Sequence, residues 1–299
     1  MGARAFPIGH GNGLLVPDYT AAAMASFRYR GEHTLTYEVY GEGDRVLVLV
    51  HGLLMNRRMY ERLGPEMAAR GNRVICLDLL GHGRSDRPDD PRLYSMTAFA
   101  DQVLALLDHM ELDRAVIGGT SLGSNVGLEF AAWHPDRVRA LFLEMPVLEN
   151  ALTAVAVIFT PILVGLRFGT PAFKMVSRLT SRFPRSYYLL DMVLDWVRQD
   201  PEPSASVLEG LLLGRSAPPQ EDRMRLEHPA LVIGHPADPL HPFNDADQLV
   251  DEMPNARLLN ANSILEWRVN PDRLNDELAS FLDEVWAQQA EAAEAKTAG

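Results

Sequence analysis

Six short apolar runs, most of them separated by segments with helical spacing, constrain the fold of this chain more than any other feature. In chain order they are RVLVLV, NRVICLDL, RAVIGG, RALFLEM, ALVIG and ARLLNA. Uninterrupted runs of this kind are typical of strands in a parallel sheet that is covered on both faces. The segments MYERLGPEMAARG, MTAFADQVLALLDHM and GSNVGLEFAAWHP, which lie between them, repeat apolar residues as amphipathic helices do. This alternation predicts an α/β fold with a doubly wound sheet.

The first strands and the last helix have different patterns. From Ser26, SFRYRG and HTLTYEVYG alternate polar and apolar residues, which predicts an antiparallel hairpin with one exposed face. Near the C-terminus, PDRLNDELASFLDEVW begins with a proline suited to a first helical turn and repeats apolar residues on one side. The expected fold is therefore a mostly parallel eight-stranded sheet with helices on both faces.

The strand and helix alternation stops between Glu144 and Pro229, where a long and largely helical stretch intervenes. We interpret this stretch as an inserted helical cap. The predicted division is a core of residues 1–145 and 228–299 with a cap of residues 146–227.

The two ends of the chain are expected to lie outside the packed core. Residues 1–24 contain scattered Pro, Gly and Asn and no continuous apolar run before a cleavage site, so they are interpreted as an N-terminal extension and not as a signal peptide. The tail of residues 287–299 is rich in helix formers but has no apolar face, and is expected to be disordered.

Composition limits the partners and the compartment. The 299 residues are 47% hydrophobic and 23% charged, which is enough apolar material for one large core. The formal net charge of -12 repels phosphate groups, so we expect no nonspecific binding to nucleic acid or anionic lipid. The single cysteine, Cys76, cannot form an intramolecular disulfide and lies in an apolar run, so a buried strand position in a cytoplasmic protein is predicted.

One segment invites a membrane interpretation. From Ala151, ALTAVAVIFTPILVG runs uncharged for about 16 residues and contains Pro161. A membrane-spanning helix needs roughly 20 apolar residues. A buried or pocket-lining helix is therefore expected, and no integral membrane span.

The strand RAVIGG runs directly into GTSLG, residues 119–123, and then into an apolar helix. A sharp turn between a strand and a helix would hold the Ser121 hydroxyl at the helix N-terminus, and Gly119 and Gly123 would let neighbouring elements approach. GxSxG alone is common by chance, and a glycine-rich helix start would produce the same letters. The context of strand, turn and helix favours a nucleophile.

Three further motifs follow predicted strands. HGLLMN, with His51 and Gly52, comes after RVLVLV and places the Leu53 amide where it could join that of Leu122 in binding an oxyanion. DLLGHGRSD follows the next strand, and LVIGHPADPLHP places Asp238 after the serine in chain order.

With these four motifs in this order, the chain resembles the α/β-hydrolase family from about Ser26 to Trp286. The resemblance implies Ser121 as nucleophile, Asp238 as the acid, and the Leu53 and Leu122 amides as the oxyanion hole. Members of this family that attack with a carboxylate are disfavoured, because a serine at the turn between strand and helix implies an acyl-enzyme.

The chain departs from the family at the general base. The family histidine follows the eighth strand, but ARLLNANSILEWRVNP contains none, and no histidine follows His241. A serine hydroxyl is a weak nucleophile without a base. His241, three residues after Asp238, is the candidate base, and the alternative is that it only fills a pocket wall. Glu144, which ends the predicted sixth strand, is a second possible acid.

The region that lacks the histidine could be purely structural. We expect Glu266 and Arg268 to form an ion pair there, with Ile264, Leu265 and Trp267 packed underneath.

The sequence therefore predicts a serine hydrolase for a small to medium hydrophobic carboxylic ester or thioester, because the cap is rich in apolar residues. The alternative is a non-catalytic or impaired hydrolase-fold protein that binds a hydrophobic small molecule. No cofactor and no metal are expected, since the histidines lie in turns and not at a helical metal-site spacing. The oligomeric state stays open.

Overall fold

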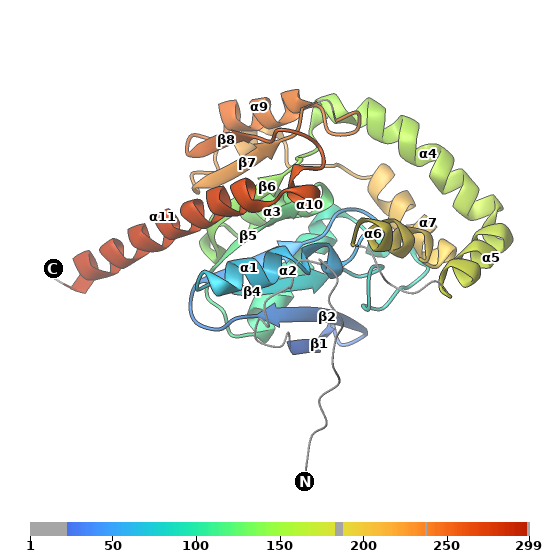
Figure 1. Ribbon diagram of the computed structural model, residues 1–299, viewed down its shortest axis with the longest axis horizontal. Helices are drawn as coiled ribbons and strands as arrows, with labels where there is room; N and C mark the ends of the chain where they lie inside the picture. The colour runs from blue at the N-terminus through green and yellow to red at the C-terminus, as the bar shows by residue number, and fades with distance from the viewer. Residues whose placement is uncertain (1–22, 183–187, 237, 298–299) are drawn as a thin grey trace, which may run out of the picture.

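The computed structural model describes residues 23–182, 188–236 and 238–297, so most of the predicted N-terminal extension lies outside the described residues. Its sheet has eight strands in the order β1-β2-β4-β3-β5-β6-β7-β8 (Figure 1). The strands are β1 Ala23–Tyr29, β2 His33–Tyr40, β3 Val46–Val50, β4 Arg73–Asp78, β5 Ala115–Thr120, β6 Val138–Glu144, β7 Ala230–Gly234 and β8 Ala256–Asn260. β1 and β2 pair antiparallel, β2 also pairs antiparallel with β4, and every pair from β4 to β8 is parallel. The predicted fold class is confirmed.

Helices cover both faces of this sheet. They are α1 Leu63–Ala69, α2 Met96–His109, α3 Leu122–Trp133, α9 Phe243–Glu252, α10 Glu266–Val269 and α11 Asp272–Thr297, with short 3-10 turns η1 Arg57–Tyr60, η2 Pro91–Leu93, η3 Pro135–Arg137 and η4 Glu149–Ala151. Strand β3 shows why both faces must be covered. Val48 and Val50 pack with α2 and α3, whereas Leu47 and Leu49 pack with α1 and α11. Successive side chains of a strand point to opposite faces, so a fully apolar strand needs helices on both.

Between β6 and β7, the described residues of the segment predicted as a cap form five α-helices. They are α4 Leu152–Phe168, α5 Thr170–Thr180, α6 Tyr188–Val197, α7 Pro201–Leu212 and α8 Gln220–Arg223. In Figure 1, α4 forms the outer margin of the molecule from the neighbourhood of α9 to α5, and α6 and α7 lie inside that arc. We call residues 146–227 the cap segment.

Of the two alternatives for the apolar helix after Ala151, buried or pocket-lining, the structure agrees with the second. Within α4 only Leu166 is buried, but the inner side chains line cavities described below. Within the described residues, one helical segment, Glu149–Phe168, is long and apolar enough to cross a membrane by length and composition, and only 11% of its most apolar stretch is buried. Its outer half is therefore exposed apolar surface.

The expectation of a disordered tail also needs correction. α11 continues without interruption to Thr297, so residues 287–297 are helical. Ala, Glu, Gln and Lys have strong helix propensity, and a helix already nucleated by its packed first turns can extend without a new nucleation cost.

Candidate active site

Ser121 lies in the sharp turn that joins β5 to α3. Its φ of 56° and ψ of -109° are a conformation that non-glycine residues rarely adopt, and its amide donates to the Glu144 carbonyl at 2.8 Å. A Cβ atom on Gly119, whose φ is 158°, would lie 1.9 Å from the carbonyl oxygen of Val50, and one on Gly123 would lie 1.8 Å from the same atom. Only glycine fits at either position, so GTSLG has the geometry of a nucleophile elbow.

His241 hydrogen-bonds to both Ser121 and Asp238. Its Nε2 lies 2.8 Å from Ser121 Oγ, and its Nδ1 lies 2.9 Å from Asp238 Oδ2. A carboxylate only accepts hydrogen bonds, so Nδ1 carries the proton and Nε2 is left as the acceptor for the serine hydroxyl. Ser121, His241 and Asp238 therefore form a hydrogen-bonded chain of hydroxyl, imidazole and carboxylate.

The short loop between β7 and α9 supplies both Asp238 and His241. Asp238 Oδ1 accepts the amides of Leu240 at 2.8 Å and His241 at 3.1 Å, which folds the loop back on the carboxylate. Burial tends to raise the pKa of Asp238, but the hydrogen bond and charge of His241 and these amides outweigh it and lower the pKa. The carboxylate therefore stays ionised beside the imidazole.

The residues proposed for the oxyanion hole lie beside Ser121. Leu53 and Leu122 line one cavity together with Ser121. His51 is fully buried behind this loop. Its Nε2 accepts the Leu79 amide at 3.2 Å, so its Nδ1 donates to the Gly52 carbonyl at 2.9 Å, and burial lowers its pKa. His51 thus acts as a neutral support for the loop that holds Leu53.

A family model described as alpha/beta hydrolase fold matches residues 45–174, which include the HGLLMN motif and the nucleophile elbow. The chain has the α/β-hydrolase fold, and the family model matches less than half of its length. Among curated relatives, the chain is 36% identical over 104 residues to the AB hydrolase superfamily protein YisY of Bacillus subtilis, covering 34% of this chain and 38% of that protein. The chain spans only about a third of the length of the first curated relatives it matches.

Solved structures extend the likeness in fold over most of the chain. A hydrolase from Pseudomonas aeruginosa PA01 superposes with a TM-score of 0.71 at 22% identity, covering 87% of this chain and 98% of the other. The enol-lactonase from Burkholderia xenovorans LB400 gives a TM-score of 0.69 at 24% identity, covering 87% and 100%.

Glu144, the alternative acid, contacts a different histidine. It is buried, accepts a short hydrogen bond from Thr120, and faces His235 Nε2 at 3.2 Å and Arg268 Nη2 at 3.4 Å. Burial would raise the pKa of Glu144, but the charge of Arg268 and the proximity of His235 lower it to about 2. Glu144 is thus held by His235 and Arg268, whereas Asp238 contacts His241.

The expected pair between Glu266 and Arg268 does not form. Glu266 instead pairs with Arg273 at 2.8 Å, while Arg268 reaches Glu144 in the sheet. Trp267 is buried as expected, but Ile264 and Leu265 are exposed, so that part of the packing prediction was also wrong. His235 Nδ1 bonds the Ser263 carbonyl at 3.0 Å. The loop that lacks a histidine is therefore held by a buried network of His235, Glu144 and Arg268, which no local sequence signal predicts.

Two apolar cavities lie under the cap segment. The cavity at Ser121 measures about 70 Å³ and is lined from the cap segment by Val155, Phe159, Leu208 and Leu211. A second cavity of about 320 Å³ lies under Ile162, Leu166, Phe173 and Val176 and includes Leu54, which follows the oxyanion candidate Leu53 in the chain. Successive turns of α4 thus line the two cavities. Sequence analysis did not single out these lining residues.

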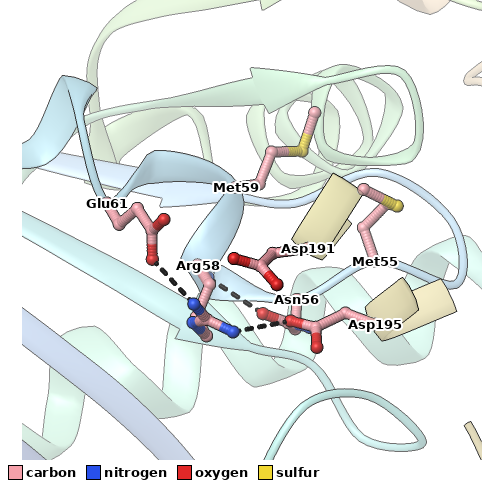
Figure 2. A pocket seen from close by; sticks show the side chains of 7 residues that line it. All are labelled: Met55, Asn56, Arg58, Met59, Glu61, Asp191 and Asp195. Atoms are coloured by element: carbon pink, nitrogen blue, oxygen red, sulfur yellow. Dashed lines mark hydrogen bonds and ion pairs between the residues drawn. The ribbon is translucent and has the colours of Figure 1, made fainter. Parts of the chain in front are cut away.

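A third, polar pocket shows how the cap segment is attached to the core. Arg58 bridges Glu61 at 3.2 Å and Asp195 of α6 at 3.0 Å (Figure 2). The pocket measures only about 10 Å³, and neither Ser121 nor His241 lines it. This cluster links α6 to η1.

Proposed function

We propose that this protein is a cofactor-independent serine hydrolase that cleaves a small hydrophobic carboxylic ester or thioester through an acyl-enzyme on Ser121. The observation that carries the proposal is the hydrogen-bonded chain of Asp238, His241 and Ser121. The alternative of binding without turnover rested on the lack of a base after the eighth strand. An imidazole nitrogen 2.8 Å from the serine hydroxyl argues against that alternative.

The proposed reaction has two halves. His241 Nε2 takes the hydroxyl proton as Ser121 Oγ attacks the carbonyl carbon, and the oxyanion forms beside the Leu53 and Leu122 amides. Protonated His241 then donates to the leaving alkoxide or thiolate as its bond to carbon breaks, which leaves the acyl group on Ser121. Water attacks the acyl group with His241 again as base, and releases the acid and free serine. Ionised Asp238 stabilises the imidazolium in both halves.

The cavity supports a short acyl group. Its lining is almost entirely apolar apart from Ser121, Asn125 and Ser216, and its volume of about 70 Å³ leaves space for only a few heavy atoms. The amide of Asn125 bonds the Val147 and Ser216 carbonyls at 2.6 Å each, which fixes the wall. We therefore propose esters or thioesters of short, unbranched acids as substrates.

Labelling with a fluorophosphonate tests the nucleophile directly. We expect intact-mass spectrometry to show one phosphonyl adduct on the wild type and none on Ser121→Ala, because only an activated serine displaces the fluoride promptly. Ser124→Ala is the matched control, since Ser124 lies one turn further along and its hydroxyl bonds backbone carbonyls. An unlabelled wild type would refute the proposed function.

Phe159 is expected to limit the length of the acyl chain. It lies on the inner face of α4 and lines the cavity at Ser121. Phe159→Ala should raise the ratio of kcat/KM for octanoyl over acetyl p-nitrophenyl esters at least about tenfold, since each additional buried methylene contributes about 0.8 kcal/mol. Phe168→Ala is the matched control, because Phe168 lies on the same helix and is 85% exposed. Equal ratios in all three proteins would contradict this assignment.

A further inference from the structure

The helices that roof the two cavities carry an unusual concentration of apolar side chains on their outer surface. Nine large hydrophobic residues of α4 and α5 are exposed, namely Leu152, Val157, Ile158, Val164, Phe168, Phe173, Met175, Val176 and Leu179. We call these nine residues the outer patch. Helices that are apolar all round are normally buried in a protein or in a membrane.

Charge is distributed unevenly around the outer patch. The protein has 40 acidic residues and a net charge of -12, yet residues 151–190 contain no Asp or Glu and five Lys or Arg. Arg167 and Lys174 pair with Glu209 and Glu202 of α7 at 2.6 and 2.8 Å. These two cations are therefore neutralised by α7, whereas Arg178 is exposed on α5 beside the outer patch. The charge bordering the patch thus differs in sign from the net charge of -12 that opposes binding of the whole protein to anionic lipid.

We propose that the outer patch docks on an anionic lipid surface. A lipid interface accepts exposed apolar side chains into its acyl boundary and attracts basic residues that border them. α4 would lie in the plane of the interface and would not span the bilayer, because its inner side chains Phe159, Ile162 and Leu163 pack against the protein core.

A second copy of this chain fits the patch less well. A symmetric dimer would bring the same surface of each copy together, so that the exposed Arg178 of both copies would lie at the contact. Like charges at the edge of an apolar contact oppose association. An anionic membrane matches both properties of the patch.

The patch also continues into the second cavity. Phe173 and Val176 are 36% and 41% exposed and line that cavity together with Ile162 and Leu166. A molecule dissolved in the membrane could thus enter under α5 and pass along the inner face of α4 towards Ser121. This route rests on the proposed function, whereas docking itself does not.

Vesicle flotation tests the docking. We expect wild type to float with vesicles of equal parts phosphatidylglycerol and phosphatidylcholine, and more weakly with phosphatidylcholine alone. Val157→Asp should lower the partition coefficient at least about tenfold, since it replaces an inserted apolar side chain with a charge. The matched control is Val269→Asp in α10, because Val157 and Val269 are 67% and 64% exposed, and it should float as wild type does.

A charge variant tests the basic component. Arg178→Glu should lower partitioning to the anionic vesicles at least about fivefold and leave the weak association with phosphatidylcholine unchanged, because a basic residue at an anionic surface contributes about 1 kcal/mol. Arg45→Glu, on the core, is the matched control. Ser121→Ala should float as wild type does, so a failure of the proposed hydrolase activity would leave this result intact.

Two outcomes would overturn the proposal. One is a wild type that floats with neither vesicle type. The other is equal loss of binding in Val157→Asp and Val269→Asp, which would show that the patch has no special role. If wild type instead sediments as a dimer that Val157→Asp dissociates, and does not float, a second copy covers the patch and the lipid proposal is wrong.

Discussion

Replacing His241 with alanine is expected to lower kcat/KM for a short-chain ester by about 10⁴-fold or more. Removal of the base leaves the Ser121 hydroxyl protonated at the moment of attack, and residual turnover would come only from the oxyanion hole and substrate binding. The measurement is initial-rate hydrolysis of p-nitrophenyl acetate with fluorophosphonate labelling in parallel. Both the hydrolysis and the adduct should be lost together.

His235 provides the matched control for this variant, because it comes from the same loop as His241 but bonds the Ser263 carbonyl and faces Glu144. His235→Gln is expected to keep prompt labelling even if its thermal stability falls. If labelling survives in His241→Ala and disappears in a folded His235→Gln, the base is His235 and its assignment to His241 is wrong. Circular dichroism of each variant separates loss of the fold from loss of the base.

The fold was predictable because its signals are local and repeated. RVLVLV, NRVICLDL and RAVIGG are each apolar throughout, and the structure places them as β3, β4 and β5 with helices on both faces. Ser121 was identifiable for the same reason, since the turn that strains its backbone requires Gly119 and Gly123 beside it. These requirements are imposed by neighbouring residues in the chain and are therefore visible in it.

The position of the candidate base was only partly predictable. A separation of three residues between Asp238 and His241 suggested a turn, but the sequence could not show whether the imidazole also reaches Ser121, which is 120 residues earlier. That contact depends on β7 lying beside β6, which in turn pairs with β5. Distances across a sheet are set by topology and loop conformation, and no spacing rule gives them to the nearest ångström.

The exposed side of α4 was not predictable for a different reason. A helix that is apolar on all sides gives no direction in which it should face, so composition indicates burial on both sides. The structure buries only the side that lines the cavities. An apolar helix buried in its own protein and one covered by a partner outside the chain have the same composition. The sequence alone therefore does not distinguish the two.

Replacing Arg268 with methionine is expected to lower the free energy of unfolding by about 3 to 5 kcal/mol, as measured by urea denaturation at pH 7. Arg268 is the cation that faces the buried Glu144 carboxylate at 3.4 Å, and its removal leaves that charge with the His235 imidazole at 3.2 Å and the Thr120 hydroxyl as partners. Arg45→Met is the matched control, since its ion pair with Asp283 is exposed and should contribute less than about 1 kcal/mol.

The double variant Arg268→Met with Glu144→Gln should recover much of the loss, because it removes the buried carboxylate charge together with its cationic partner. The same interaction contributes to the acid dependence of wild-type stability. The pKa of Glu144 is lowered from 4.5 to about 2, so its contribution is complete above pH 4.5 and is lost as the pH falls towards 2. Wild type and the double variant should therefore converge in stability as the pH is lowered through this window. A constant difference between them across it would show that Glu144 is not stabilised as an ion, and that Arg268 acts through packing alone.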